Sequence, residues 1–189
     1  MSVKSDRVKL ALLVKITIGK LQMGYVQELR LLVGHRPLII PGAAVLIVDQ
    51  QENLLLQHRK DNQQWGLVGG SMEVGESLEE TARRETFEET SLELDELEWF
   101  GLFSGQELIY EYPNRDIVVN VTAVYIARQF RGRLKANEEA HEIRFFKLRE
   151  LPTDLSPPDR PVIERYIRSQ LERSPSLQFF DHEDDDNCH

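Results

Sequence analysis

Residues 69–92 of this chain read GGSMEVGESLEETARRETFEETSL, and this stretch decides how the rest of the chain is interpreted. Glycines open it, and the part from Ser77 to Thr90 contains neither glycine nor proline, which predicts a helix. Ser77 and Glu80 have the spacing of a capping box, so we expect the helix to begin directly after the glycine-rich loop. Small or apolar residues at four-residue steps form its expected core face: Leu78, Ala82 and Thr86.

Three glutamates share another face of this helix. Glu85, Glu88 and Glu89 stand at i, i+3 and i+4, so their carboxylates lie within about 100° of arc. Crowding like charges costs a few tenths of a kcal/mol per exposed pair, and more when the pair is partly buried. Hard divalent cations such as Mg²⁺ would offset this cost, because they take carboxylate oxygens and bridge them to phosphates. A solvated acidic surface is the alternative that a lone Glu-x-x-Glu-Glu would favour.

The flanks of this stretch alternate between helical and extended patterns. Apolar spacing predicts helices at 25–33 and 161–171, and apolar β-rich runs predict strands at 43–48, 54–57, 92–103, 117–127 and 143–147. The turn 113–116 predicts a hairpin that pairs 108–112 with 117–127. Strands mixed with few helices indicate one α/β domain with a mixed sheet.

Composition limits the class of protein. The chain has 189 residues, of which 41% are hydrophobic and 29% charged, so it is neither mostly disordered, collagenous nor an integral membrane protein. Its net charge is 23 − 32 = −9, and five of the acids fall within 179–189. The remaining body carries 23 − 27 = −4, which argues against binding duplex nucleic acid by phosphate neutralisation.

The two ends differ from the body, which we place at 23–173. Residues 1–22 are expected to be an appendage of unknown role, with Met23 as an alternative start. Their apolar run is broken by Lys15 and is too short for a secretory core or a membrane span. Residues 174–189 are expected to be an acidic disordered tail. The single cysteine, Cys188, cannot form an internal disulfide, which predicts a reducing, cytoplasmic location.

Six residues at fixed spacing distinguish the segment from a lone acidic patch: Gly70, Glu76, Arg84, Glu85, Glu88 and Glu89. The segment resembles the signature box of the Nudix (MutT-like) hydrolases, which reads Gly, five residues, Glu, seven residues, Arg-Glu-apolar-x-Glu-Glu-x-Gly-apolar. The resemblance extends over about 25–171, and every charged position of the box matches. Thr86 stands where an aliphatic is usual, Ser91 where glycine is usual, and Val68 where proline often stands.

The resemblance implies a Nudix-like α/β/α sandwich with a mixed central sheet. It also implies a pyrophosphohydrolase that cleaves a nucleoside diphosphate linked to another group and uses Mg²⁺, with Mn²⁺ as a substitute. Glu88 and Glu89 would be metal ligands, and Glu85 a ligand or the base that activates water. The Gly70 carbonyl, or that of Gly69, would face the metal.

Other roles follow from the same resemblance. Arg84 would orient the carboxylates of the helix, and Glu76 would brace the loop. A later carboxylate often completes such sites. Glu139 is preferred here for its spacing, with Glu142 and Glu138 as alternatives.

The substrate pocket is less clearly marked in the sequence. Arg59 could contact a phosphate or be an exposed arginine at a strand end. Tyr110 lies 110 − 92 = 18 residues past Leu92, where a tyrosine accompanies dinucleoside polyphosphate hydrolases in the family. Tyr112 and Trp65 are further stacking candidates. The proline position of ADP-ribose hydrolases is not matched, so the nucleotide derivative stays open.

Two functions compete with hydrolysis on such a fold. One is a non-catalytic nucleotide-sensing or regulatory domain, although a retired site has no physical reason to keep four aligned glutamates. The other is an isomerase, which would need an additional cysteine or acid in the pocket, and the body contains no cysteine. Among partners, the resemblance implies a small-molecule nucleotide and no membrane, and homodimers are common in the family.

Overall fold

The computed structural model describes residues 23–173 and divides the chain into two compact units, with the boundary between Gly34 and His35. The predicted appendage 1–22 and tail 174–189 lie outside the described residues. In the first unit, helix α2 (Tyr25–Val33) forms where the apolar spacing predicted it, and it ends at Gly34, whose N–H donates to the Arg30 carbonyl at 2.8 Å. The domain limits 23–173 stay a prediction.

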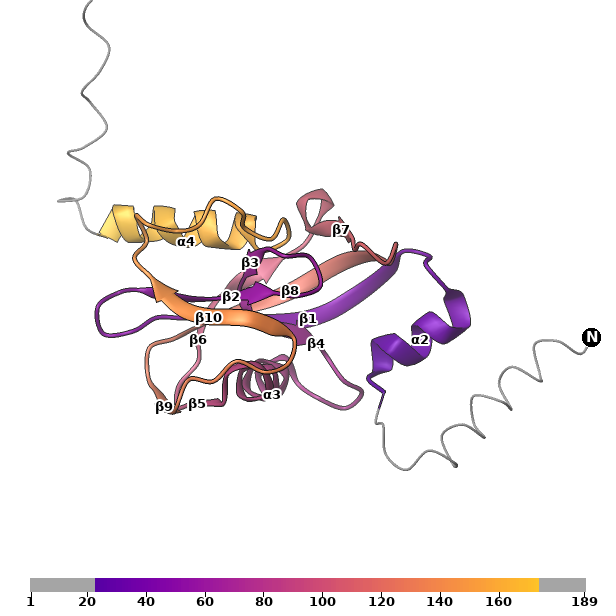
Figure 1. Cartoon of the computed structure of the whole chain (residues 1–189), viewed down its shortest axis with the longest axis horizontal. Coiled ribbons are helices and arrows are strands. Elements are labelled where there is room, and N and C mark those ends of the chain that lie inside the picture. The colour runs from indigo at the N-terminus through magenta and orange to yellow at the C-terminus, as the bar shows by residue number, and fades with distance from the viewer. Residues whose placement is uncertain (1–22, 174–189) are drawn as a thin grey trace, which may run out of the picture. The chain divides into compact units, whose positions relative to one another are not determined.

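The second unit is built from β-strands, two α-helices and a 3₁₀ turn (Figure 1). Its strands are β1 (Leu38–Ile47), β2 (Leu54–Arg59), β3 (Trp65–Gly66), β4 (Val68–Ser71), β5 (Leu92–Leu94), β6 (Glu98–Phe103), β7 (Ile109–Glu111), β8 (Ile117–Ala127), β9 (Phe130–Gly132) and β10 (Ala140–Phe146). Its helices are α3 (Leu78–Thr90), the 3₁₀ turn η1 (Gln106–Leu108) and α4 (Arg160–Arg173).

The strands form one larger mixed sheet and two smaller antiparallel ones. The larger sheet has the order β4-β1-β8-β6, with β7 also paired to β8. Only β1 and β8 are parallel within it, and the other pairs are antiparallel. The smaller sheets are β10-β2-β3 and β5-β9. The predicted mixed sheet is therefore confirmed.

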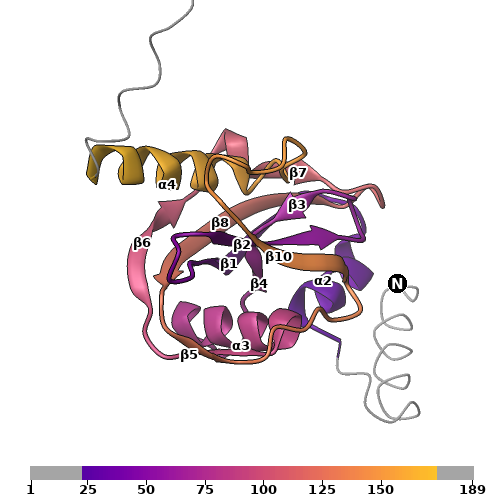
Figure 2. The same ribbon diagram turned by 60° about the vertical axis from the view of Figure 1, so that its left-hand side comes forward.

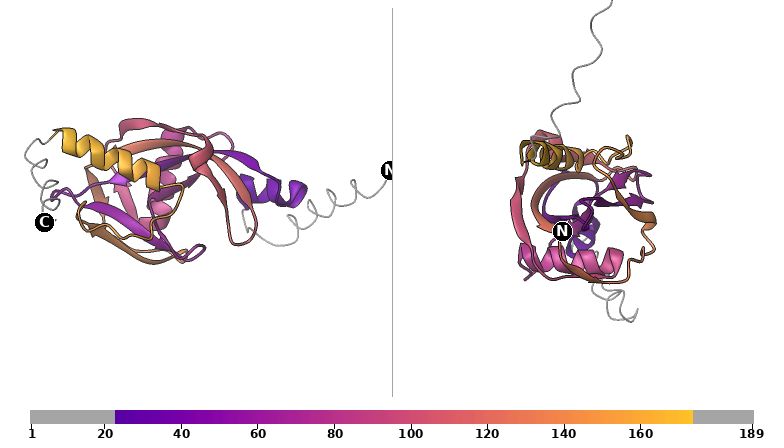
Figure 3. Two further views of the ribbon diagram at one scale, coloured as in Figure 1. Left: turned by 90° about the horizontal axis from the view of Figure 1, so that it is seen from above. Right: turned by 90° about the vertical axis from the view of Figure 1, so that its left-hand side faces the viewer.

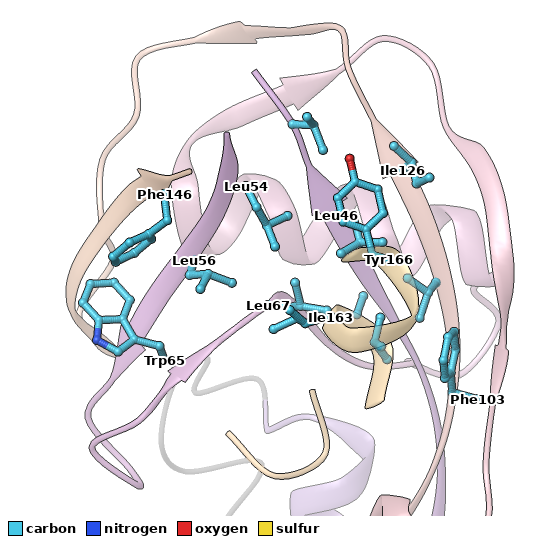
Figure 4. Close-up of a cluster of buried hydrophobic side chains, with 14 of the residues drawn as sticks. Leu46, Leu54, Leu56, Trp65, Leu67, Phe103, Ile126, Phe146, Ile163 and Tyr166 are labelled. Carbon is cyan, nitrogen blue, oxygen red and sulfur yellow. The ribbon is translucent and has the colours of Figure 1, made fainter. Parts of the chain in front are cut away.

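Helices α3 and α4 lie on opposite sides of the strands, which gives the sandwich its layers (Figures 2 and 3). The alternation of side chains along β1 produces two cores, because successive residues of a strand point to opposite faces. Ala43, Val45 and Ile47 pack on the α3 side. Their neighbours Ala44 and Leu46 pack on the α4 side, in the cluster that includes Ile163 and Tyr166 (Figure 4).

The expected strand 92–103 is wrong as one element. The structure breaks it at 95–97 into β5 and β6, which belong to different sheets. The Asp95 N–H donates to the Gln129 carbonyl at 3.0 Å, at the point where the chain leaves the β5-β9 pair. The predicted hairpin is confirmed, since β7 pairs with the start of β8.

The glycines of β4 bring the loop before α3 tightly against β1. Gly69 has φ 152°, and a Cβ atom there would lie 2.3 Å from the Ala43 carbonyl oxygen. Any side chain at this position would therefore push β4 away from β1. Because the glycine permits the close approach, the next residue, Gly70, comes into contact with α3.

Candidate active site

Helix α3 begins and ends as the sequence predicts. The Ser77 hydroxyl accepts a hydrogen bond from the Glu80 N–H at 3.2 Å, and Glu80 Oε2 accepts one from the Ser77 N–H at 2.7 Å. Both halves of the capping box are therefore present. At the other end Ser91 adopts the left-handed conformation, with φ 61° and ψ 20°. The helix is thus fixed directly behind the glycine-rich loop.

Two of the three predicted glutamates pack against that loop. The carboxylate of Glu89 is buried, and its Oε2 accepts a hydrogen bond from the Gly69 N–H at 2.9 Å. Glu85 lies against Gly70, because a Cβ atom built on Gly70 would be only 2.5 Å from Glu85 Oε1. Glu88 is more exposed, with 56% of its side chain accessible. The helix face and the loop therefore form one cluster of oxygen atoms.

Arg84 ties this cluster together. Its Nη1 donates to Glu85 Oε1 at 2.8 Å and to Glu88 Oε2 at 3.1 Å. Its Nε and Nη2 donate to the two oxygens of Glu76 at 2.5 and 2.9 Å, and Nη2 also reaches the Ser71 carbonyl at 3.0 Å. This two-point contact with Arg84 is the main cause that lowers the pKa of Glu76 to about 2. These contacts join Arg84 to Glu76, Glu85 and Glu88, and the orienting and bracing roles stay predictions.

Two carboxyl groups on the acidic face of α3, those of Glu85 and Glu89, have raised pKa values. Burial raises the pKa of Glu89 to about 8, although a hydrogen bond from Gln57 and the charge of Arg59 act in the other direction. Burial also raises the pKa of Glu85, and the nearby charges of Glu88 and Glu139 add to this effect. Carboxyl groups that resist ionisation in their own surroundings are stabilised as anions by a cation.

The raised pKa of Glu85 also bears on which glutamate is the later carboxylate. Glu139 is close enough to Glu85 for its charge to act on it. Glu142, on strand β10, instead pairs with Arg144 at 3.6 Å. Glu138 contributes its backbone carbonyl to Lys60 Nζ at 2.7 Å. Glu139 as the later carboxylate therefore stays a prediction, with this charge effect on Glu85 in its favour.

As they stand, no three His, Cys, Asp or Glu side chains between residues 23 and 173 form a preformed metal cage. The Arg84 guanidinium engages one oxygen of Glu85 and one of Glu88. The second oxygen of each carboxylate makes no such contact with it. The side chains of this face offer carboxylate oxygens, which fit a hard divalent cation.

A cavity of about 190 Å³ opens beside strand β4. Gly69, Gly70 and Ser71 of this strand line it, whereas no residue of α3 does. The remaining walls come from β1, β8, the end of β2, Leu67, the residue after β7, the segment before α4 and the first turn of α4. Their polar members are Arg59, Tyr112, Asn120, Thr122, Ser156 and Asp159.

The two candidate tyrosines occupy different places. Tyr112 lines the cavity, whereas Tyr110 packs edge-on against Tyr112 with ring centroids 4.8 Å apart. Trp65 is buried in the core on the α4 side and does not line the cavity. Of the aromatic residues considered from the sequence, Tyr112 is thus the one placed to meet a ligand in this cavity.

Several residues near the cavity escape detection by sequence reasoning. Asp159 accepts a hydrogen bond from the Leu67 N–H at 3.2 Å, and burial raises its pKa to about 6. In the sequence it reads only as the residue before a helix. Gln57 contacts Glu89 but reads as the end of an apolar strand. Asn120 and Thr122 lie within β8, where only the β-rich pattern is visible.

Comparisons with known proteins agree with this geometry. A family model described as NUDIX domain matches residues 39–166. The ADP-ribose pyrophosphatase of Methanocaldococcus jannaschii is 34% identical over 139 residues, which cover 71% of this chain and 78% of that protein. The NAD-capped RNA hydrolase NudC of Vibrio cholerae is 30% identical over 120 residues, which cover 62% of this chain but only 41% of that protein.

A solved structure shows the same fold. The crystal structure of a MutT NUDIX hydrolase from Burkholderia pseudomallei superimposes with a TM-score of 0.58 at 26% identity, and the match covers 67% of this chain and 97% of that one. Within residues 23–173, no helix is long and apolar enough to cross a membrane. The solved structure thus shares the fold of this chain.

Proposed function

This chain belongs to the Nudix family, and on that premise we propose that it hydrolyses the pyrophosphate bond of a nucleoside diphosphate linked to a further group. One observation carries the proposal: the carboxylates of Glu85 and Glu89 meet the glycine-rich loop, which also lines the cavity. A phosphate chain lying across this loop would meet the carboxylates at one end and the cavity at the other.

We assign the cofactor as Mg²⁺, with Mn²⁺ as a substitute. Glu85, Glu88 and Glu89 on α3 would hold it, with Glu139 and the Gly70 carbonyl completing the set. The cation supplies charge neutralisation on the phosphates and lowers the pKa of water at the site. The raised pKa values of Glu85 and Glu89 support the assignment, because bound positive charge would offset the cost of ionising both groups.

The protein groups would position the reaction. Arg84 holds the carboxylates of Glu85 and Glu88 by hydrogen bonds, and Glu76 holds Arg84. Glu85 would also accept a proton from attacking water, since burial raises its pKa and makes it a stronger base. Glu76, in the segment before α3, would therefore fix Arg84, and Arg84 would in turn fix the carboxylate of Glu85.

The cavity would hold the nucleoside portion and a phosphate. Tyr112 offers an aromatic face for stacking, and Arg59 offers a guanidinium to a phosphate. The names of the two relatives make ADP-ribose and NAD-capped ends the first substrates to test. Tyr110 supports the wall of the cavity through its contact with Tyr112 rather than lining it.

Product analysis over a nucleotide panel tests the proposal. The panel contains ADP-ribose, NAD, NAD-capped RNA, dinucleoside polyphosphates, nucleotide sugars, and ordinary and oxidised nucleoside triphosphates. Each is incubated with Mg²⁺, with Mn²⁺ and with EDTA. We expect metal-dependent cleavage of a pyrophosphate bond in at least one substrate. Cleavage that continues unchanged in EDTA would contradict the metal assignment, and silence across the panel with metal bound would favour a sensing role.

A cytoplasmic location and a homodimeric state are also proposed. Both follow from the family resemblance and the cysteine usage rather than from a contact in the structure. Sedimentation velocity of the full chain would measure the oligomeric state directly, with a homodimer expected.

A further inference from the structure

We propose that Asp61 is a positioning residue that aims one edge of the Arg59 guanidinium into the cavity, where this edge binds a phosphate group of the substrate. The inference rests on the proposed function and adds a determinant of substrate binding to it. It concerns the turn between β2 and β3, which lies outside the signature segment 69–92.

Asp61 grips one side of the guanidinium with both of its oxygens. Arg59 Nε donates to Asp61 Oδ1 at 3.1 Å, and Nη2 donates to Oδ2 at 2.7 Å. The carboxylate is itself held, because its Oδ1 also accepts the Asn62 N–H at 2.8 Å. Such a bidentate pair fixes the plane of the guanidinium, not only its position.

The rest of Arg59 is also restrained. Its backbone N–H donates to the Gln64 carbonyl at 2.9 Å, and its carbonyl accepts from the Gln63 N–H at 3.1 Å. The stem runs past Gly66, where a Cβ atom would lie 3.4 Å from Arg59 Cδ. The hydrogen bonds of the turn, the close approach to Gly66 and the carboxylate of Asp61 together restrict the conformations of the Arg59 side chain.

The unused edge of Arg59 belongs to the cavity. Arg59 lines the cavity and Asp61 does not. Asp61 therefore binds the guanidinium from outside the cavity. A guanidinium has five N–H donors, and Asp61 engages two of them. Within residues 23–173, Nη1 makes no hydrogen bond. The edge formed by Nη1 and Nη2 therefore keeps a pair of donors whose spacing suits two phosphate oxygens.

Arg59 supplies the positive charge of the cavity. Arg59 is the one lysine or arginine among the described residues that line it. Arg59 is only 24% exposed, which strengthens a charged hydrogen bond relative to the surface.

Removing the Asp61 charge distinguishes positioning from repulsion. If Asp61 merely repelled a phosphate, its neutralisation would tighten binding of an anion. If Asp61 positions Arg59, the same change weakens binding, because the guanidinium loses its fixed plane. Asp61 is 39% exposed, so solvent screens its direct repulsion, and we expect the positioning effect to dominate.

Calorimetric titration with ADP in the presence of Mg²⁺ measures this directly. We expect Arg59→Ala to weaken ADP binding at least about tenfold and Asp61→Asn about three- to tenfold. Asp61→Asn should cause no further loss when Arg59 is already alanine, because Asp61 acts through Arg59. Asp61→Glu retains the carboxylate and should bind ADP more tightly than Asp61→Asn. Unchanged or tighter binding in Asp61→Asn would overturn the inference, as would additive losses in the double variant.

Glu52→Gln is the matched control. Glu52 holds Arg128 through two hydrogen bonds of 2.7 and 2.8 Å, and neither residue lines the cavity. This change removes a comparable ion pair and should leave ADP binding unaltered. Thermal unfolding of every variant confirms that the fold is retained.

Kinetics separate this inference from the proposed function. With a substrate that the chain turns over, Asp61→Asn should raise KM three- to tenfold and change kcat less than about twofold. Turnover without any effect of Asp61→Asn would overturn the inference and leave the function intact. If no substrate is found, the ADP titrations still test whether Asp61 positions Arg59. Failure of the unmodified protein to bind ADP would overturn the assignment of Arg59 as a phosphate ligand.

Discussion

The carboxylate of Glu85 occupies the space that a side chain at residue 70 would need. A Cβ atom built on Gly70 would lie 2.5 Å from both Cδ and Oε1 of Glu85 and 2.6 Å from Oε2. The position of the Glu85 carboxylate on α3 thus requires that residue 70 of β4 has no side chain. This contact explains why a glycine is required here even though its backbone dihedrals are open to other residues.

Gly70→Ala should therefore abolish most activity without unfolding the protein. The new methyl group displaces the end of a flexible side chain, so the backbone can stay in place while the Glu85 carboxylate moves. We expect kcat to fall about 100-fold, since misplacement by about 1 Å has that effect on positioned groups. Turnover and thermal unfolding measure the two effects. Gly101→Ala, whose new methyl group would meet the Arg165 side chain at 3.1 Å and the Phe103 ring at 3.5 Å, is the matched control and should keep full activity.

Glu88→Gln tests the exposed member of the acidic face. Glu88 makes one hydrogen bond, to Arg84 at 3.1 Å, so its loss should change the melting temperature little. We expect turnover to fall at least about 100-fold, because an anionic oxygen donor is removed from the predicted metal set. Glu79→Gln, an exposed change on the same helix, should leave turnover intact. Retained activity in Glu88→Gln would remove this residue from the site.

The course of α3 could be predicted from the sequence because its signals are local. Ser77 and Glu80 set its start, and Ala82 and Thr86 take the core positions that their spacing indicates. The acidic face then follows from helical geometry alone. The contact of Glu85 with Gly70 is consistent with the same local signals, because loop and helix are adjacent in the chain.

The cavity could not be predicted, because it is assembled from distant segments. Arg59, Tyr112 and Asp159 come from three parts of the chain and meet only after the sheet has formed. Each has an ordinary local explanation as a strand end, a turn flank or a helix start. The break between β5 and β6 could not be predicted for a similar reason, because the sequence of β9, the partner of β5, does not indicate a strand.

Thr86→Val should stabilise the protein. Thr86 is fully buried, and its hydroxyl has no hydrogen-bond partner among residues 23–173. Valine has nearly the same shape and removes an unsatisfied polar group, so we expect the free energy of unfolding to rise by about 1 kcal/mol. Thr90→Val provides the contrast, because the Thr90 hydroxyl donates to the Thr86 carbonyl at 2.6 Å and accepts from the Leu92 N–H at 3.1 Å. Urea unfolding should show opposite signs for the two variants, and equal signs would contradict the assignment.

Ser91→Gly should also stabilise the protein, through the backbone. Ser91 ends α3 with φ 61°, a left-handed conformation that costs a side chain roughly 1 kcal/mol relative to glycine. Its N–H donates to the Phe87 carbonyl at 2.9 Å, a bond that glycine can keep. We expect a rise of about 0.5–1 kcal/mol in the free energy of unfolding. Ser91→Ala retains the Cβ atom and should show no such gain.

The Glu76–Arg84 pair should make stability depend on pH in the acid range. Arg84 and the hydrogen bonds from Glu73 and Thr81 lower the pKa of folded Glu76 from 4.5 to about 2. Since the unfolded chain binds a proton first as the pH falls, the contribution of Glu76 is fully present above about pH 5 and is lost between there and about pH 2.

Glu76→Gln measures this contribution. At pH 7 the variant should be less stable than the unmodified protein by about 2 kcal/mol, because a partly buried pair with two-point geometry is broken. The difference should shrink steadily as the pH falls from 5 to 3, which urea unfolding at a series of pH values would show. A difference that stays constant over this range would mean that the Glu76 charge contributes nothing and that only its shape matters. A difference that grows as the pH falls would reverse the sign of the linkage and exclude the pair as a source of stability.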